Sequence, residues 1–164
     1  MDTLAEQFRA AMRRLAGGVA LVTTFHDGSR HGMTASSVTS LSMAPPSLLA
    51  CVNRSASLHE PIHRGGLYCV NLLRAHQAHL AGVFASKPEG ESRFDHGRWT
   101  TDSNGLPALQ DCLASISCRV AATADFGTHT VFMGHVQEVR LSGAVDPLIY
   151  VDGQFGGFST EPVG

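Results

Sequence analysis

Short runs of β-branched and apolar residues, separated by turn-forming residues, recur along most of this chain. The clearest runs cover residues 19–25, 48–52, 67–73, 114–126, 130–141 and 147–151. Runs of this kind that end near glycine, proline or polar clusters are typical of strands joined by turns. Helical patterns occur at 3–15, where Thr3 and Glu6 have capping-box spacing, and at 75–86. Many strands with few helices between them favour an antiparallel barrel over a sheet of βαβ units.

The residues between the runs predict how the strands connect. Asp27-Gly28 favours a hairpin in which residues 31–40 return beside the first strand. Residues 55–64 suit a short helix that Pro61 limits. Residues 87–105 are polar and lack periodicity, so we expect a long surface loop there.

Size and charge restrict the class of protein. The 164 residues suit one domain spanning 1–164. Charged residues make up only 16% of the chain, which suggests that some surface is hidden in an oligomer. The net charge of -2 argues against a nucleic-acid partner. No apolar stretch is long enough for a membrane span, and the charged N-terminal residues do not resemble a signal peptide.

The four cysteines contain no Cys-x-x-Cys pair, and two of them lie inside apolar runs. Free, buried thiols are therefore expected, and they place the protein in the cytoplasm. The nine histidines lack the spacing of metal ligands, so no metal site is predicted. Glycine-rich nucleotide motifs and the serine-hydrolase elbow are also absent from the sequence.

Several polar clusters could carry chemistry. Gly32 to Ser37 combines small residues, which allow a ligand to approach the backbone, with hydroxyls that suit a phosphate or the polar edge of a heterocycle. Asn53, Ser55 and Ser57 lie where a strand ends and a helix begins, and helix N-termini bind anions. From composition alone, an ordinary Ser/Thr-rich edge strand is favoured for the first cluster, and an ordinary helix cap is the alternative for the second.

Three further features complete this set of candidates. Asn71 is a lone amide within an apolar strand and needs hydrogen-bond partners, either from a ligand or from a turn. Cations and aromatic residues stand together at 84–87 and 93–94, where a solvated loop beside core aromatics is the alternative. His129 lies at the turn between the two longest strands, where its side chain could touch a ligand or simply be exposed.

Taken in order, these clusters resemble the flavin reductase family with a split-barrel flavin-binding domain. The similarity runs from Phe8 and Gly17-Gly18 to Pro147–Tyr150. It implies a mainly β fold: a split antiparallel β-barrel that binds FMN, with helices at the barrel ends. It also implies a homodimer that uses NADH or NADPH to reduce FMN or FAD for a partner monooxygenase.

The resemblance assigns roles by position. His129 falls on the family's Gly-Asp/Thr-His motif and would position the nicotinamide, although Thr128 stands where Asp is frequent. The other implied residues would contact the flavin: its polar edge or ribityl chain, its phosphate, its ring system and the outer pocket. In chain order they are Thr34, Ala35, Ser36, Ser37, Asn53, Ser55, Ser57, Asn71, Leu72, Phe84, Ser86, Lys87, Arg93 and Phe94.

Two other functions fit a barrel of this kind. One is a flavin- or heme-binding protein that stores or senses without turnover. The other is an oxidase of small substrates similar to the pyridoxamine-phosphate oxidases, which would want a denser basic phosphate site. The residues do not distinguish FMN from FAD, or NADH from NADPH.

Overall fold

The structure is a computed structural model that describes residues 3–86 and 90–162. Its helices and strands, in chain order, are α1 (Leu4–Met12), β1 (Gly17–Gly18), β2 (Ala20–His26), β3 (Ser29–Ala35), β4 (Val38–Met43), β5 (Pro46–Asn53), α2 (His59–Gly65), β6 (Leu67–Leu72), η1 (Ala75–Gln77), α3 (Ala78–Ala85), η2 (Gly90–Asp95), β7 (Trp99–Thr101), β8 (Pro107–Leu109), β9 (Ala114–Phe126), β10 (His129–Leu141), β11 (Ile149–Val151) and β12 (Gln154–Gly156). The η elements are short 3₁₀ helices.

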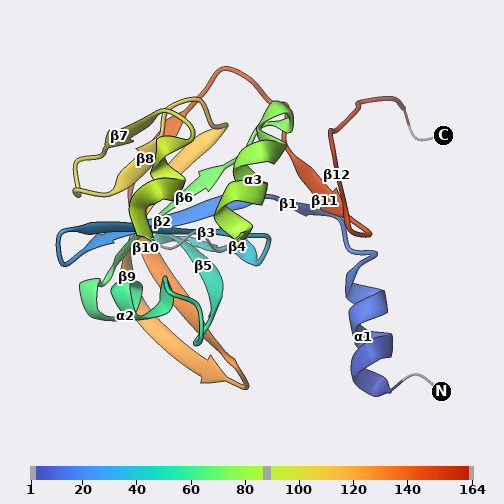
Figure 1. Ribbon diagram of the computed structural model, residues 1–164, viewed down its shortest axis with the longest axis horizontal. Helices are drawn as coiled ribbons and strands as arrows, with labels where there is room; N and C mark the ends of the chain where they lie inside the picture. The colour runs from blue at the N-terminus through green and yellow to red at the C-terminus, as the bar shows by residue number, and fades with distance from the viewer. Residues whose placement is uncertain (1–2, 87–89, 163–164) are drawn as a thin grey trace.

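An antiparallel sheet of seven strands, in the order β3-β2-β6-β9-β10-β5-β4, forms the body of the protein. The two edge strands, β3 and β4, are consecutive in the chain and are separated only by Ser36 and Ser37. The sheet must therefore curl until its two edges approach each other. The long strands β9 and β10 cross the whole body, and α2 and α3 lie toward its opposite ends (Figure 1). The prediction of a mainly β split barrel with helices at its ends is confirmed.

The core is divided between the barrel interior and the space under α3. Inside the barrel, the buried side chains of Tyr68 and Phe132 pack among aliphatic residues of β2, β5 and β6. Under α3, Leu80 and Phe84 pack against Leu21 of β2 and Phe94 of η2. This second cluster fixes α3 and η2 against the barrel.

Several connections match the sequence prediction and one does not. Asp27 and Gly28, both with positive φ (50° and 76°), make the expected hairpin turn between β2 and β3. The returning strand does not extend over 31–40, however. It stops at Ala35, and β4 then pairs with β5 instead of β2. The change of partner strand occurs at Ser37. Its carbonyl accepts from the amide of Cys51 on β5, and its hydroxyl donates to the carbonyl of Cys51.

The expected loop at 87–105 is the clearest error among the elements. Where the structure describes it, this segment contains η2 and β7. Phe94 and Trp99 meet edge to face with ring centroids 4.9 Å apart, and both pack on Phe84. Burial of these aromatic rings orders a segment that has no periodic pattern. The strands β8 and β12 were not predicted, and the helix expected at 55–64 begins only at His59.

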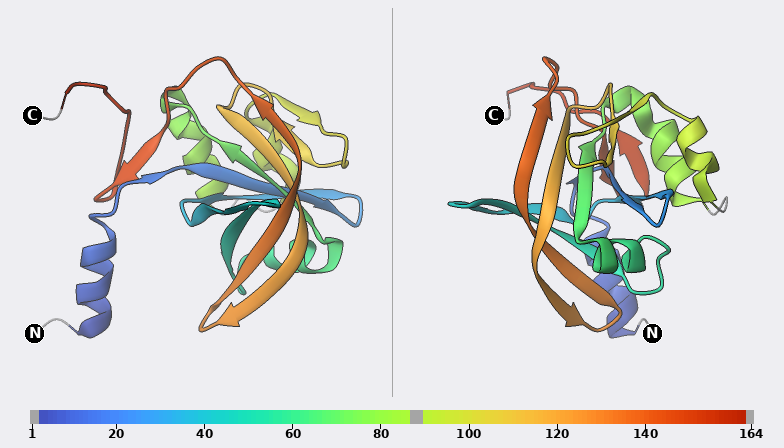
Figure 2. Two further views of the ribbon diagram at one scale, coloured as in Figure 1. Left: turned by 180° about the vertical axis from the view of Figure 1, so that it is seen from behind. Right: turned by 90° about the vertical axis from the view of Figure 1, so that its left-hand side faces the viewer.

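Helix α1 has the predicted capping box between Thr3 and Glu6 but buries none of its residues. It projects from the barrel together with β11 and β12, as Figures 1 and 2 show. Leu4 and Phe8 are 82% and 64% exposed on this helix. No helix in the described part of the chain is both long and apolar enough to cross a bilayer.

Candidate functional site

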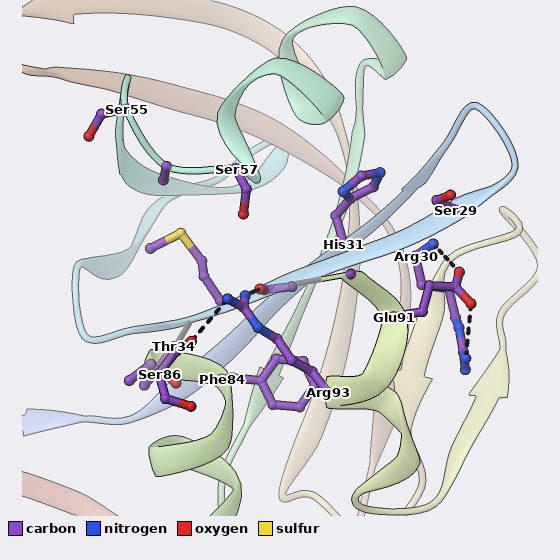
Figure 3. A pocket seen from close by; sticks show the side chains of 15 residues that line it. Ser29, Arg30, His31, Thr34, Ser55, Ser57, Phe84, Ser86, Glu91 and Arg93 are labelled. Carbon is purple, nitrogen blue, oxygen red and sulfur yellow. Dashed lines mark hydrogen bonds and ion pairs between the residues drawn. The ribbon is translucent and has the colours of Figure 1, made fainter. Parts of the chain in front are cut away.

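A cavity of about 780 Å³ opens beside β3. Its walls come from β3, the segment between β5 and α2, the C-terminal end of α3, and η2 (Figure 3). The lining residues are Ser29, Arg30, His31, Gly32, Met33, Thr34, Ser55, Ala56, Ser57, Phe84, Ala85, Ser86, Gly90, Glu91 and Arg93. The volume lies within the range of about 300–1,000 Å³ that is usual for small-molecule sites.

Gly32 shapes the cavity through the aromatic packing behind it. A Cβ at this position would lie 2.7 Å from a ring carbon of Phe84 and 3.3 Å from the Phe94 ring. The sequence analysis predicted that the absence of a side chain at Gly32 lets a ligand approach the backbone, but the Phe84 ring occupies that space. Glycine is therefore required here so that β3 and α3 can approach closely.

Arg93 joins three walls of the cavity. One guanidinium nitrogen donates to the carbonyl of Gly32 on β3 (2.6 Å), and another donates to the carbonyl of Ser86 at the end of α3 (3.0 Å). Its Nε is buried without a partner among the described residues. None of the ion pairs among the described residues includes Arg93. The positive charge at this wall is therefore not neutralised by a described carboxylate.

Arg30, in contrast, is paired. Its backbone amide donates to Glu91 at 2.6 Å, and its guanidinium lies 3.4 Å from the same carboxylate (Figure 3). The amide hydrogen bond is the main cause, and the guanidinium a lesser one, of a pKa for Glu91 below its ordinary value. The guanidinium also lies 4.7 Å above the ring of Phe94. These contacts fasten η2 to β3.

Most hydroxyls of the cavity are already donating to the protein. Thr34 Oγ1 donates to the carbonyl of Ala81 (2.6 Å), and Ser86 Oγ donates to the carbonyl of Val83 (2.9 Å). The hydroxyl and the amide of Ser55 both donate to the side chain of Asn53. Ser57 differs, because its exposed hydroxyl has no partner among the described residues. It is the hydroxyl of this wall that is free to donate to a ligand.

The structure brings Thr34, Ser55, Ser57, Phe84, Ser86 and Arg93 together around this cavity. Asn53 stands behind the wall and supports Ser55. Ser57 is not at a helix N-terminus, because α2 begins two residues later and Leu58 occupies its N-cap position. The anion site expected from a helix start is therefore not formed by Ser55 and Ser57.

The remaining sequence candidates lie elsewhere. Ala35 is buried in the barrel core, and Leu72 packs against that core. Ser36 and Ser37 are exposed at the β3–β4 connection, outside the cavity. Phe94 is buried behind Phe84. Lys87 lies outside the described residues.

Asn71 is fully buried, and it is satisfied by the protein itself. Its amide nitrogen donates to the carbonyl of Leu21 (3.1 Å) and to the hydroxyl of Thr23 (3.2 Å). Its oxygen accepts from the amide of Leu109 at 2.8 Å. These bonds join β2, β6 and β8, so the structure places Asn71 in the core and not in the cavity.

His129 is the first residue of β10, directly after the turn. It is exposed, and its Nδ1 lies 2.9 Å from the hydroxyl of Thr128. It does not line the cavity, but it pairs across the ladder with Asn53, two residues before the wall begins at Ser55. It is thus a neighbour of the wall.

Sequence reasoning missed Ser29, Arg30, His31 and Glu91. Three of them precede Gly32 on the strand that was predicted to hold the site, so extending the cluster toward Asp27 would have included them. No such signal marks Glu91, since only the folding of η2 brings it to β3. No cluster of three His, Cys, Asp or Glu side chains within the described ranges could hold a metal ion.

The flavin reductase like domain matches residues 12–159 of this sequence, which includes every wall of the cavity. The chain belongs to the flavin reductase family. An FMN reductase (NADH) RutF from Methylorubrum populi is 40% identical over 98% of this chain and 79% of its own length. The reductase component of an FADH2-dependent resorcinol hydroxylase from Rhizobium is 39% identical over 94% of this chain and 87% of its own.

A solved structure of the flavin reductase family shares the fold. The NADH:FAD oxidoreductase of Streptomyces globisporus, in complex with NAD and FAD fragments, superposes with a TM-score of 0.88 at 29% identity. The match covers 94% of this chain and 93% of that one. The expected flavin reductase fold is therefore confirmed by sequence and by structure.

Proposed function

We propose that this flavin reductase transfers a hydride from NADH or NADPH to FMN or FAD in the cavity beside β3, and releases the reduced flavin to a separate monooxygenase. The observation that carries the proposal is a cavity of flavin-accommodating size, walled by segments that all fall within the matched family domain. One relative named above is itself the reductase component of a hydroxylase.

The groups around the cavity fit a flavin. Arg93 offers a positive charge without a described carboxylate partner, and Ser57 offers a free hydroxyl, so both suit the phosphate or the polar edge of the ring. Met33, which is partly buried at the cavity, offers apolar surface to the ring system. A hydrogen bond to a charged group contributes roughly 1.5–3 kcal/mol. Because micromolar affinity needs only about 8 kcal/mol, a few such bonds with ring contacts are sufficient.

A bound flavin supplies the hydride-accepting chemistry, and the protein supplies position and electrostatics. The walls hold the ring and limit the access of water. The charge of Arg93 favours an anionic ligand. His129 has the supporting role of orienting the nicotinamide, and hydride transfer requires no protein base. The change His129→Ala should lower turnover and weaken nicotinamide binding while leaving flavin affinity nearly unchanged.

Anaerobic mixing tests the reaction. The purified protein is combined with FMN or FAD and with NADH or NADPH while the visible absorbance of the flavin is recorded. We expect bleaching of the flavin that requires both partners, and the four combinations identify the preferred flavin and nucleotide. Flavin binding without nucleotide oxidation would instead indicate a protein that stores or senses flavin.

The flavin is proposed to be an exchanging substrate. Because few polar groups are available to bind the flavin, we expect a moderate affinity. Lower affinity appears mainly as faster dissociation. Extensive dialysis should remove the flavin, and activity should return when flavin is added. Ser57→Ala should raise the flavin concentration that gives half-maximal rate. Protein that keeps stoichiometric flavin through dialysis would show a prosthetic group instead.

A homodimer is the proposed assembly. Leu4, Phe8 and Met12 follow helical spacing along α1, Leu15 lies in the turn just after it, and all four are at least 44% exposed. An apolar face of this kind on a projecting helix is typical of a protein interface. A second copy of the chain is the proposed occupant, as is usual for closed two-fold assemblies. The four free cysteines suit a reducing compartment, and we propose the cytoplasm.

Sedimentation tests this assembly. The wild-type chain should sediment at twice its mass of 17.4 kDa. Phe8→Glu should shift the protein toward monomer because it places a charge on the apolar face. Ala10→Glu adds the same charge on the opposite side of α1 and should leave the dimer intact. A wild-type monomer at all concentrations would refute the proposal.

A further inference from the structure

The cavity wall at 55–57 has little regular structure of its own. It lies between β5 and α2 in a turn where the amide of Ala56 donates to the carbonyl of Asn53 (2.9 Å). The side chain of Asn53 supports the same turn by accepting from Ser55. A segment with so few ladder bonds keeps its position only when other parts of the molecule hold it.

Arg54 fastens the beginning of this wall to the β9–β10 turn. Its backbone amide donates to the carbonyl of Thr128 at 2.9 Å, and its guanidinium donates to the carbonyl of Gly127. One residue thus holds two consecutive carbonyls of the turn. The described ion pairs do not include Arg54, so its side chain is committed to the turn and not to a carboxylate.

His59 fastens the other end of the wall to the same hairpin. Its Nε2 lies 2.8 Å from Thr130 Oγ1, and that hydroxyl donates to Asp125 at 2.6 Å. Because the single proton of the Thr130 hydroxyl goes to Asp125, His59 must be the donor through Nε2–H. Thr130 is 1% exposed, and His59 also packs against Phe132, with ring centroids 5.4 Å apart.

The two attachments, at Arg54 and His59, lie directly before and shortly after the wall at 55–57 in the sequence. On the hairpin, the residues that they bind lie on either side of His129. Figure 1 shows α2 beside the lower halves of β9 and β10, toward the end where their turn lies. The wall of the flavin cavity and the backbone of His129 are therefore parts of one connected unit.

We propose that Arg54 and His59 are positioning residues, which tie the cavity wall at 55–57 to the β9–β10 turn so that flavin and nicotinamide meet in one fixed geometry. The kinetic part of this inference depends on the proposed flavin reductase activity. Reacting atoms must lie about 3–3.5 Å apart for transfer, and a misplacement of about 1 Å can cost on the order of 100-fold in rate. A wall that moves independently of the turn would lose this alignment.

The variants Arg54→Gln and Thr130→Val test the two attachments separately. Arg54→Gln shortens an exposed side chain so that it no longer reaches Gly127, and it leaves the backbone bond in place. Thr130→Val removes the acceptor of His59 without changing the shape of the side chain. Arg64→Gln is the matched control, because Arg64 is an exposed arginine of α2 whose one partner within the described ranges is Glu60.

Three measurements are needed: single-turnover hydride transfer at saturating ligands, a flavin titration, and hydrogen–deuterium exchange without ligands. We expect the single-turnover rate constant to fall about tenfold or more in both attachment variants, with flavin Kd changed by less than about threefold. Deuterium uptake should rise together in 55–59 and in 127–130. The control should match the wild type in every readout.

An unchanged single-turnover rate constant in both variants, or uptake that rises in only one of the two segments, would overturn the inference. If Thr130→Val does not fold, Arg54→Gln decides alone, since its change is at the surface. If the wild-type protein oxidises no nicotinamide, the proposed function fails while the exchange experiment still decides whether the wall and the turn are coupled.

Discussion

Replacing Gly32 by alanine tests whether this glycine exists for protein packing or for the ligand. The new Cβ would lie 2.7 and 2.9 Å from two carbons of the Phe84 ring. That ring is 1% exposed and packs against Phe94 and Trp99, so it cannot swing away. Either β3 must shift, or the whole aromatic cluster around Phe84 must repack.

The magnitude follows from two opposing terms. Overpacking a dense core costs about 1–3 kcal/mol, and removing a glycine from a strand interior returns about 0.5–1 kcal/mol. From the midpoints of these two ranges we expect Gly32→Ala to lower the free energy of unfolding by about 1 kcal/mol. For a chain of this size that corresponds to a loss of about 2–4 °C in Tm. Flavin Kd should rise as well, because Arg93 bonds to the carbonyl of Gly32.

Thermal unfolding of the flavin-free protein measures the first effect. Gly82→Ala is the control, because Gly82 is exposed in α3 and a Cβ there would meet nothing within 4 Å. That variant should be more stable than the wild type by about 0.5–1 kcal/mol. A Gly32→Ala protein that melts at or above the wild-type temperature would refute the packing argument.

Three other predictions follow from single contacts. Asn71→Ala leaves buried partners such as the Leu109 amide unsatisfied, so urea denaturation should show a loss of about 2–4 kcal/mol, while the folded variant should bind flavin normally. The folded pKa of Glu91 lies below its ordinary 4.5, so its contribution to stability is present above pH 4.5 and is lost as the pH falls through the folded pKa. Glu91→Gln should therefore flatten the dependence of the unfolding midpoint on pH in that acidic range. Burial raises the pKa of Cys69 to about 12, so an alkylating reagent at about pH 8 should label half-buried Cys51 and spare Cys69 until the protein unfolds. Equal labelling of the two thiols would contradict this.

The sequence predicted those parts of the fold that local chemistry determines. A two-residue hairpin turn requires positive φ, which Asp27 and Gly28 adopt, and the hairpin that they predict is present. The capping box of α1 is present for the same kind of local reason. Local patterns could not show that the chain leaves β3 at Ser36 to pair with β5, because that choice depends on Cys51 across the sheet.

The candidate site was harder to predict, because its residues are far apart in the sequence and meet only when the chain folds. Glu91 reaches the cavity only because Phe94, three residues later, is buried against α3. Asn71 is a polar residue of a kind that often binds ligands, but its side chain is hydrogen-bonded to the backbone of Leu21 and Leu109 in the core. A polar residue in an apolar strand signals that a partner exists, and the sequence cannot tell whether that partner is a ligand or the backbone.

The polar groups of the cavity mostly hold its walls together, and this limits how tightly a ligand can bind. Thr34, Ser55 and Ser86 each donate their hydroxyl proton to the protein. Arg93 gives two of its donors to backbone carbonyls, and Arg30 is paired with Glu91. A ligand therefore meets a rigid cavity with few free donors. Rigidity lowers the entropic cost of binding and alignment, whereas the scarcity of donors keeps the total affinity moderate. An enzyme that must align a flavin for hydride transfer and then release it requires both properties.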